Sequence, residues 1–417
     1  MELKGKKLLI LGANAETIPI VKRAQEMGIV VFVTDHIKTS AAKKVADGFY
    51  DINGKDVNRI VEIFNRDGFD GILLGVADPL TEAYVKICEE LKIPCMVDKN
   101  SIALCSNKTL FKDECRKAGM NTVKEFFSVT DIISAREKDI VEYPIVIKPA
   151  ISRGGNGVCL CRNVQQMNVA FEKAKQFSEN SEVIGEEYIE ADDCVATFLV
   201  LDGETHLVAM SDRILLKNKE GLATVTYSNQ FPSKYTKLFQ ANELERYKVL
   251  FNNLNIQNGI FNIQMFKKGI GFVPYDSDCI INGECSSKLI AEVYGIDVIG
   301  GWIEYVLNGK REILQQGIKK LSVTNGVGAS VWISLNEGIL CKIEGKKEVS
   351  ILPQVVESLW RLKEGVHINA EMVGCEHATL ARIWVKDNDR ELLQKDIDII
   401  RKKVLAYDEE NNYMILN

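Results

Sequence analysis

The stretch Tyr143 to Cys161, YPIVIKPAISRGGNGVCLC, decides how the rest of this chain is interpreted. An apolar run from Ile145 to Ile147 ends in Lys148-Pro149, a glycine-rich loop follows, and a second apolar run closes the segment. This pattern predicts two strands joined by a glycine-rich hairpin, with a lysine at the end of the first strand. A loop with few side chains lets backbone N–H groups approach phosphate oxygens, and Lys148 adds a positive charge. The alternative is a surface hairpin with a solvated lysine.

Length and composition indicate a soluble protein of several domains. The 417 residues exceed one ordinary domain, and the 46% apolar content is enough for real cores. The net charge of -6 gives no reason to expect nucleic acid or an anionic membrane as a partner. The chain shows no signal peptide and no run of 18 apolar residues, so we expect no membrane span.

Cysteine and histidine usage predicts a reduced, cytoplasmic protein without a zinc centre. The eleven cysteines are odd in number and scattered, with no CxxC pair, which favours free buried thiols. Cys159 and Cys161 are expected to share one face of a strand. The four histidines do not cluster in the sequence.

The order of predicted elements divides the chain into four parts. Residues 1–100 alternate continuous apolar strands with amphipathic helices, which predicts a parallel, Rossmann-like sheet. The turn after the first strand keeps Gly12 but lacks the later glycines of a dinucleotide fingerprint, so an NAD-dependent oxidoreductase is disfavoured. Residues 101–185 hold the glycine hairpin, residues 186–315 strands with an antiparallel pattern, and residues 316–417 a small α+β cap.

Four further residues are candidates for phosphate or metal binding. Lys108 opens a predicted helix that runs to about Ala118, with Ser106 as its N-cap. Asp276 and Asp278 are two apart on a predicted strand and so share one face. Gln264 lies 12 residues before Asp276, on the preceding strand of a predicted hairpin, where it can reach the same side. Oxygen donors of this kind suit Mg²⁺, although the tripeptide Asp-Ser-Asp is by itself more typical of a polar turn.

In this order, these features resemble the ATP-grasp enzymes of the carboxylate–amine ligase and carbamoyl-phosphate-synthase-like type. The resemblance covers essentially the whole chain. It implies α/β and α+β domains: a Rossmann-like pre-ATP-grasp domain (1–100), a two-subdomain ATP-grasp clamp (101–185 and 186–315) and a C-terminal α+β cap (316–417).

The resemblance also implies roles for individual residues. Lys108 and Lys148 would contact ATP phosphates, beneath a lid formed by Ser152, Arg153, Gly154, Gly155, Asn156 and Gly157. The hinge that pairs with adenine would be Glu186, Glu187, Tyr188 and Ile189, and Asp193 would hold the ribose. The metal ligands would be Gln264, Asp276 and Asp278. Arg213 is a candidate catalytic contact to phosphate or substrate.

The chain departs from the family pattern on its metal strand. The family has an arginine where this chain has Ile280, and an arginine there would neutralise the transferring phosphate. Lys288, eight residues later, is a candidate to replace it. The hinge has Ala191 in place of the usual glycine.

The chemistry that the resemblance implies uses ATP and Mg²⁺, or Mn²⁺, to activate a small carboxylate as an acyl-phosphate that an amine then attacks. Two alternatives stay open: an ATP-binding paralogue with weakened or no catalysis, and a bicarbonate-using enzyme of the carbamoyl-phosphate-synthase type. A homodimer is expected from the resemblance alone. The sequence does not identify the substrates; Arg382 could bind a carboxylate, and a surface arginine on a strand is the simpler interpretation.

Overall fold

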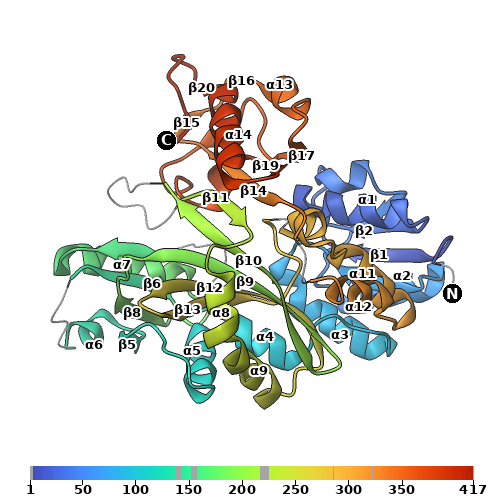
Figure 1. The fold of residues 1–417 in the computed structure, drawn as a ribbon, viewed down its shortest axis with the longest axis horizontal. Helices are drawn as coiled ribbons and strands as arrows, with labels where there is room; N and C mark the ends of the chain where they lie inside the picture. The colour runs from blue at the N-terminus through green and yellow to red at the C-terminus, as the bar shows by residue number, and fades with distance from the viewer. Residues whose placement is uncertain are drawn as a thin grey trace.

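The computed structural model describes residues 3–137, 143–151, 157–216, 225–284, 286–321 and 324–416. Figure 1 shows an N-terminal domain, a small lid subdomain that carries α7, and a C-terminal cap around α14, arranged about a central sheet. Together these confirm the predicted combination of α/β and α+β parts.

The N-terminal domain is the parallel sheet that the alternating pattern predicts. Its four strands lie in the order β3-β2-β1-β4, and β1 pairs in parallel with both β2 and β4. Residues Leu8 to Leu11 have no exposed surface, because helices cover both faces of the sheet. The elements are β1 Lys7–Leu11, α1 Ile18–Glu26, β2 Val30–Thr34, β3 Gly48–Tyr50, α2 Val57–Asp67, β4 Gly71–Leu74 and α3 Thr81–Leu91.

The first turn of this domain is stabilised by a glycine conformation and by a side-chain carboxylate. Gly12 has a φ of +91°, and the Asp35 carboxylate accepts hydrogen bonds from the backbone N–H groups of Ala13 and Ile37. Asp35 therefore braces the turn from the end of β2.

The lid subdomain confirms the strands of the glycine hairpin. β6 (Ile145–Pro149) pairs antiparallel with β7 (Cys159–Cys161), so the two cysteines do share a strand. The loop residues 152–156 lie outside the described residues; Gly157 has a φ of +75°. The remaining elements of this subdomain are β5 Glu125–Val129, α6 Ile132–Arg136, α7 Val164–Phe177 and β8 Val183–Glu187, and the sheet order is β5-β8-β6-β7. The two helices that precede it in the chain, α4 Lys99–Ser106 and α5 Lys108–Lys117, pack against β13 instead.

The predicted N-cap of the Lys108 helix is wrong by one residue. Ser106 is the last residue of α4, an additional helix that the sequence interpretation did not include. Asn107 caps α5 instead, and its side-chain oxygen accepts hydrogen bonds from the N–H groups of Thr109 and Leu110.

The central sheet has eight strands in the order β13-β12-β9-β10-β11-β14-β19-β17. The antiparallel pairing of β9, β10, β12 and β13 confirms the predicted pattern. The strands are β9 Asp192–Leu201, β10 Glu204–Leu215, β11 Thr226–Phe231, β12 Asn258–Lys268, β13 Gly271–Asp278, β14 Val327–Ser334, β17 Val355–Trp360 and β19 Thr379–Asp387.

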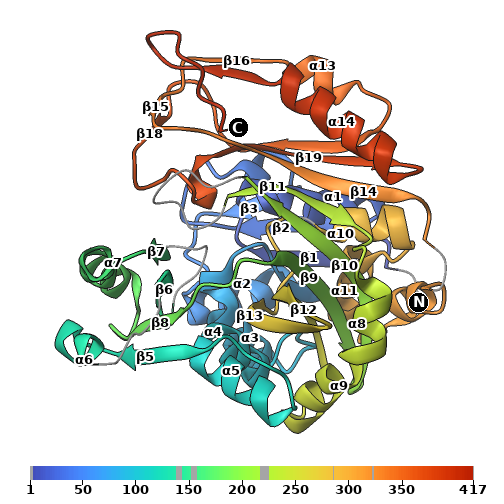
Figure 2. The ribbon, with the colours of Figure 1, turned by 60° about the vertical axis from the view of Figure 1, so that its left-hand side comes forward.

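The C-terminal part extends this sheet. β14, β19 and β17 belong to the cap by sequence, yet they continue the sheet of β9 to β13, so the predicted boundary after residue 315 separates strands of one sheet. Figure 2 shows α14 lying across this extension. The cap also contains β15 Gly338–Ile339, β16 Lys342–Glu344, α13 Lys346–Ser350, β18 His367–Ile368, α14 Arg390–Lys403 and β20 Leu405–Tyr407.

The helices between β11 and β14 connect the sheet to the N-terminal domain. Trp302 and Val306 of α11 are fully buried, and one continuous hydrophobic core joins α11, the N-terminal sheet and the central sheet. These helices are α8 Thr236–Asn242, α9 Leu244–Asn253, α10 Ser286–Leu289, α11 Val298–Asn308 and α12 Glu312–Ile318, with a π-helical turn at Ile290–Tyr294.

Candidate functional site

One face of the central sheet collects polar side chains in cross-strand rows. Gln264 on β12 lies opposite Asp276 on β13, and Asn262 lies opposite Asp278. Residues opposite each other in an antiparallel pair point to the same face, so these four side chains share one surface. The hairpin predicted for Gln264 and Asp276 is therefore present with the expected register.

Lys108 reaches this surface from the lid side of the chain. Its ammonium nitrogen lies 3.8 Å from Asp276 Oδ1, and the residue is only 8% exposed. The position follows from the local sequence, because the Asn107 cap starts α5 at Lys108 and α5 packs against β13. A cation and a carboxylate from distant parts of the sequence thus meet at one point.

A second basic group is buried where α5 meets the sheet of β5, β8 and β6. Lys148 Nζ lies 2.6 Å from Glu186 Oε2, and Lys112 Nζ lies 2.5 Å from the other oxygen of Glu186. Lys112 also pairs with Glu125. We call Lys112, Glu125, Lys148 and Glu186 the lysine cluster.

The two lysines determine the charge of Glu186. Burial alone would raise the pKa of its carboxyl, but the charges and hydrogen bonds of Lys148 and Lys112 bring the pKa below the usual value. Burial lowers the pKa of the Lys148 ammonium, and the neighbouring charges of Lys112 and Lys108 act in the same direction. A negatively charged ligand would relieve this crowding of positive charge.

Asp278 is held by a relay across three strands. Asn262 donates a hydrogen bond of 2.6 Å to Asp278 Oδ1, and Thr197 on β9 donates one of 2.9 Å to the Asn262 carbonyl oxygen. Burial raises the pKa of the Asp278 carboxyl well above its usual range, and the Asp78 and Glu284 carboxylates raise it further. We call Asp78, Asp276, Asp278 and Glu284 the acidic cluster.

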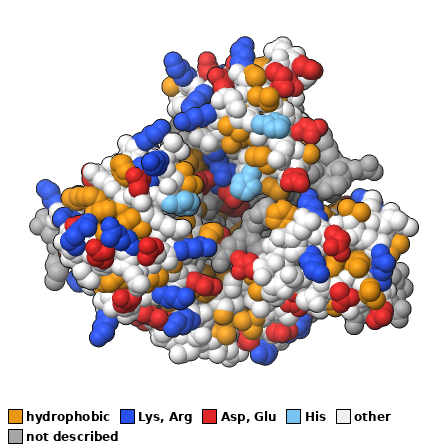
Figure 3. Space-filling view, turned by 180° about the vertical axis from the view of Figure 1, so that it is seen from behind, with side chains coloured by type: hydrophobic (Ala, Val, Ile, Leu, Met, Phe, Trp, Pro, Cys, Tyr) orange, Lys and Arg blue, Asp and Glu red, His pale blue; other side chains and the backbone are white. Residues whose placement is uncertain are grey.

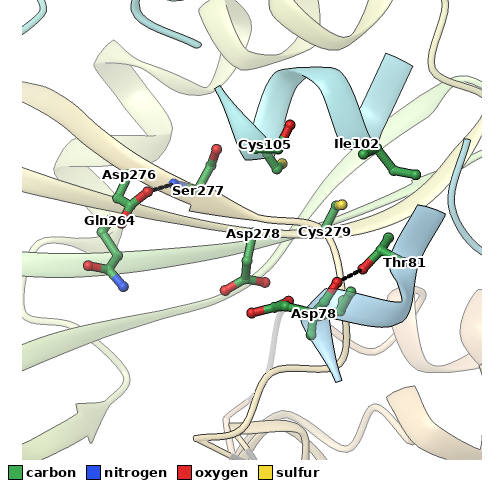
Figure 4. A pocket seen from close by; sticks show the side chains of 11 residues that line it. Asp78, Thr81, Ile102, Cys105, Gln264, Asp276, Ser277, Asp278 and Cys279 are labelled. Carbon is green, nitrogen blue, oxygen red and sulfur yellow. Dashed lines mark hydrogen bonds between the residues drawn. The ribbon is translucent and has the colours of Figure 1, made fainter. Parts of the chain in front are cut away.

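A cavity of about 150 Å³ opens beside the acidic cluster. Figure 4 shows Asp278 pointing toward Asp78 of the N-terminal domain, with Asp276 next to Gln264. Ile280, only 4% exposed, forms part of the wall where an arginine was expected by resemblance. The lining residues are Asp78, Thr81, Ile102, Cys105, Ser106, Gln264, Asp276, Ser277, Asp278, Cys279 and Ile280.

Asp193 and Arg213 lie in the next row of the same face. They are opposite each other on β9 and β10, and Arg213 Nη1 donates to Asp193 Oδ2 at 2.9 Å. The Tyr275 hydroxyl donates to the same oxygen at 2.8 Å. Burial raises the pKa of Asp193, although Arg213 and Tyr275 counteract part of that rise. The candidate ribose ligand and the candidate catalytic arginine therefore already contact each other.

Glu284 is a partly buried carboxyl that the sequence interpretation missed. Asn229 on β11 donates a hydrogen bond of 2.6 Å to Glu284 Oε2. Burial raises the pKa of Glu284, while the positive charges of Arg213 and Arg382 oppose the rise and Glu376 adds to it.

Arg382 is buried, which makes the surface-arginine interpretation wrong. It is 1% exposed, lies 2.6 Å from Glu376 Oε1 and 3.7 Å from Glu16 Oε1, and stacks on the Trp332 ring. Arg361 also pairs with Glu16. Since Glu16 comes from the N-terminal domain, these pairs tie that domain to the cap.

One face of the molecule is hollowed where the domains meet. Seen from behind, the surface is hollowed beneath the C-terminal cap, and acidic, basic and histidine side chains gather in and around the hollow (Figure 3).

Apart from Glu186, which belongs to the lysine cluster, the predicted hinge contributes mainly apolar packing and contacts with Lys124. Ile189 is 8% exposed and forms a small apolar cluster with Val123 and Val273. The Glu187 carboxylate accepts from the Lys124 N–H, and the Glu187 N–H donates to the Lys124 carbonyl. Tyr188 is partly buried.

Lys288 does not join the other predicted residues in the contacts that the structure describes. Its ammonium lies 3.9 Å from Glu357 on β17, and its side chain is 38% exposed. The compensation for Ile280 that was expected of Lys288 is thus not visible in the geometry.

The oxygen donors fit Mg²⁺ only together with a nucleotide. Among the described residues, no group of three or more His, Cys, Asp or Glu side chains is placed to hold a metal ion. Asp276, Asp278 and the amide of Gln264 are hard oxygen ligands, and Mg²⁺ commonly takes one or two carboxylates and completes its shell with phosphates and water.

Some missed residues carried a local signal. Lys112 lies four residues after Lys108 on the same helix, and Asn262 lies two residues before Gln264 on the same strand, so each shares a face with a recognised residue. Asp78 and Glu284 had no such signal, because each reaches the cavity region only through tertiary packing.

Comparison with known proteins agrees with this geometry. Residues 107–219 match the family described as "Carbamoyl-phosphate synthase L chain, ATP binding domain". Over nearly its whole length the chain superposes on the structure of an L-amino acid ligase from Bacillus licheniformis, with a TM-score of 0.80, 15% identity and coverage of 97% of this chain and 99% of the other. The chain has the ATP-grasp fold.

Two further similarities bear on this ATP-grasp chain. A formate-dependent phosphoribosylglycinamide formyltransferase from Wolinella succinogenes is 27% identical over 190 residues, which are 45% of this chain and 48% of the relative. A phosphoribosylglycinamide synthetase from Anaerococcus prevotii superposes with a TM-score of 0.72 at 17% identity, covering 97% and 100% of the two chains. The matched region spans about half the length of the curated relatives, and the structural likeness shows the fold alone. Within the described residues, no helix is both long and apolar enough to cross a membrane.

Proposed function

We propose that this protein is an ATP- and Mg²⁺-dependent ligase that activates a small carboxylate as an acyl-phosphate for attack by an amine. The observation that carries the proposal is the meeting of Lys108 with Asp276 at 3.8 Å, beside Gln264 and Asp278. It joins a phosphate-binding cation from one subdomain to oxygen donors from the other.

The proposed ligand-binding residues lie at two ends of the site. Lys148 and Lys108 would bind the phosphates of ATP, and the apolar surface of Val123, Ile189 and Val273 would lie against adenine. Asp276, Asp278 and Gln264 would hold Mg²⁺, which supplies charge neutralisation on the phosphates when bound. Arg213, oriented by Asp193, would contact the substrate carboxylate or the transferring phosphate.

The chemistry explains why no nucleophilic side chain is required. A carboxylate oxygen is a poor leaving group, so transfer of the γ-phosphoryl group to it creates one. The amine then attacks the acyl carbon and phosphate leaves. The protein contributes orientation and charge, and it excludes water from the acyl-phosphate.

A second candidate is an ATP-binding protein with weakened catalysis. Ile280 favours it, because a buried isoleucine replaces a guanidinium that would stabilise developing phosphate charge. A bicarbonate-using reaction is a third candidate. The expected homodimer stays a prediction.

The first experiment is calorimetric titration with a non-hydrolysable ATP analogue, with and without Mg²⁺. ADP release is then screened with formate, amino acids, other small carboxylates and bicarbonate, each with and without amines; formate is included because the curated relatives are named for it. Release that needs both a carboxylate and an amine is the expected result. Binding without stimulated release would favour the second candidate, and a lack of nucleotide binding would overturn the proposal.

A further inference from the structure

Two cysteines lie on the wall of the cavity, a feature that the proposed chemistry does not use. Cys105 is in the last turn of α4, and Cys279 is the residue directly after β13. Both line the same cavity, and Figure 4 shows them at the same end of it. Their thiols are in hydrogen-bonding contact.

The pair is placed between the two kinds of candidate site residue. Cys105 precedes Lys108 by three residues, and Cys279 follows Asp278 directly. α4 packs against β13, so the thiol contact spans the junction between the segment that positions Lys108 and the strand that positions the carboxylates. A covalent bond between the two sulfurs would therefore link these two segments directly.

The two thiols differ in access. Cys105 is partly exposed, whereas Cys279 is only 6% exposed. Cys105 is therefore the sulfur that a reagent reaches first, and Cys279 is the partner that completes a two-sulfur product.

We propose that Cys105 and Cys279 form a two-thiol modification site on the cavity wall, open to disulfide formation by oxidants and to capture by trivalent arsenicals. With a peroxide, the two thiols lose two hydrogens and two electrons, the S–S bond forms, and the peroxide is reduced to two waters. With an arsenous oxide, RAs=O, two As–S bonds form and one water leaves. A disulfide requires the sulfurs to approach to about 2.05 Å, closer than a thiol hydrogen bond.

The effect on ligand binding rests on the proposed function. Closing the S–S bond shifts α4 against β13, and displacements on the order of 1 Å in a phosphoryl-transfer site typically cost up to about 100-fold in activity. We expect oxidation to weaken binding of the Mg²⁺–nucleotide analogue at least tenfold, and dithiothreitol to restore it.

The test is peptide mapping of the full-length protein after treatment with diamide, and separately with one equivalent of phenylarsine oxide. Trypsin releases Cys105 within residues 100–108 and Cys279 within residues 269–288. The second peptide also contains Cys285, so fragment ions are needed to assign the linked sulfur. We expect a Cys105–Cys279 linkage in the wild type, and neither the linkage nor arsenical retention at this site in Cys105→Ser or Cys279→Ser.

The chain supplies a matched control pair. Cys88 and Cys95 are also in hydrogen-bonding contact, in the N-terminal domain, and neither lines the cavity. The variant Cys88→Ser/Cys95→Ser should keep both the Cys105–Cys279 linkage and the oxidation-dependent loss of nucleotide affinity.

The outcomes separate this proposal from the proposed function. Lack of the Cys105–Cys279 linkage while diamide oxidises the exposed Cys341 would overturn it, as would preferential linkage of Cys285. Linkage with unchanged nucleotide affinity would overturn the coupling to the cavity. If the reduced protein binds no nucleotide, the proposed function fails, and the mapping with the arsenical still decides the thiol site.

Discussion

Two glutamates of the candidate site, Glu186 and Glu284, are in opposite electrostatic states. Burial by itself favours a raised pKa for both carboxyls. Two lysines within 2.6 Å of the Glu186 carboxylate bring its pKa below the usual value. The charges of Arg213 and Arg382 lower the pKa of Glu284 by less than burial raises it, so its pKa stays above the usual value. At the end of the site proposed to bind the nucleotide, Glu186 is thus already charge-paired, whereas at the end proposed to hold the metal the pKa values of Asp278 and Glu284 are raised. Such an end needs a cation to become fully ionised.

The largest expected effect lies in the lysine cluster. Lys148→Ala removes a buried cation from the phosphate end, and loss of a charged hydrogen bond of about 1.5–3 kcal/mol corresponds to roughly 100-fold weaker nucleotide binding. Glu186 keeps Lys112 as a partner, so the variant should still fold. Calorimetry with the ATP analogue measures the loss. Lys268→Ala, at a mostly exposed lysine, is the control; equal affinities of the two folded variants would remove Lys148 from the site.

The acidic cluster should respond mainly through Mg²⁺. Asp278→Ala is expected to abolish the Mg²⁺-dependent gain in nucleotide affinity and to leave Mg²⁺-free binding nearly unchanged. Asn262→Leu removes the hydrogen bond that holds Asp278, together with the Asn262 contacts to Thr197 and the Ile280 carbonyl, and loss of such outer contacts typically costs about 10–100-fold in metal affinity. The measurement is the affinity of the ATP analogue across a Mg²⁺ series. A wild-type Mg²⁺ response in Asp278→Ala would show that this carboxylate is not a ligand.

The two ends of the site also differ in how well their residues could be predicted from the sequence. Local sequence patterns predict the residues of the lysine end: an apolar run ends at Lys148, a glycine-rich sequence follows, and a predicted helix starts at Lys108. The Gln264–Asp276 hairpin was equally readable, because strand periodicity places both side chains on one face.

The acidic end depends on contacts between distant segments. Asp78 approaches Asp278 only because the N-terminal domain packs against β13, and Glu284 follows no periodic element. The same limit explains the cap, whose strands looked like a separate unit although they continue the central sheet. The interpretation of Arg382 failed for that reason too, since its partner Glu16 is 366 residues away in sequence (382 minus 16).

Ile280→Arg tests whether the metal end is catalytically weakened. A guanidinium there would face Asp278 and the transferring phosphate, and a fully formed contact of this kind is worth on the order of 10²–10³ in rate. We expect a smaller gain, about tenfold in ADP release, because Ile280 is buried and an arginine must displace packed neighbours. Ile280→Lys is the matched variant, and Ile280→Met controls for size alone. Unchanged turnover in a folded arginine variant with intact nucleotide binding would mean that charge at this position does not limit the reaction.

The smallest expected effect concerns the pH dependence of stability at Glu284. An acid whose pKa is higher in the folded state holds its proton there more tightly than in the unfolded chain. Its contribution therefore lowers the free energy of unfolding as pH rises from about 4.5, the unfolded value, through the raised folded pKa.

Glu284→Gln removes this contribution while its amide oxygen can still accept from Asn229. The unfolding temperature of the variant should decline less between pH 5 and pH 8 than that of the wild type, and the two should converge toward pH 4.5. The exposed Glu337→Gln serves as the control and should follow the wild type throughout. Saturating Mg²⁺ and nucleotide should narrow the gap between Glu284→Gln and the wild type, because a bound cation offsets the carboxylate charge that the mutation removes. A variant that tracks the wild type across the whole range would mean that Glu284 is ionised without help, and the contrast with Glu186 would then reduce to the difference in their partners.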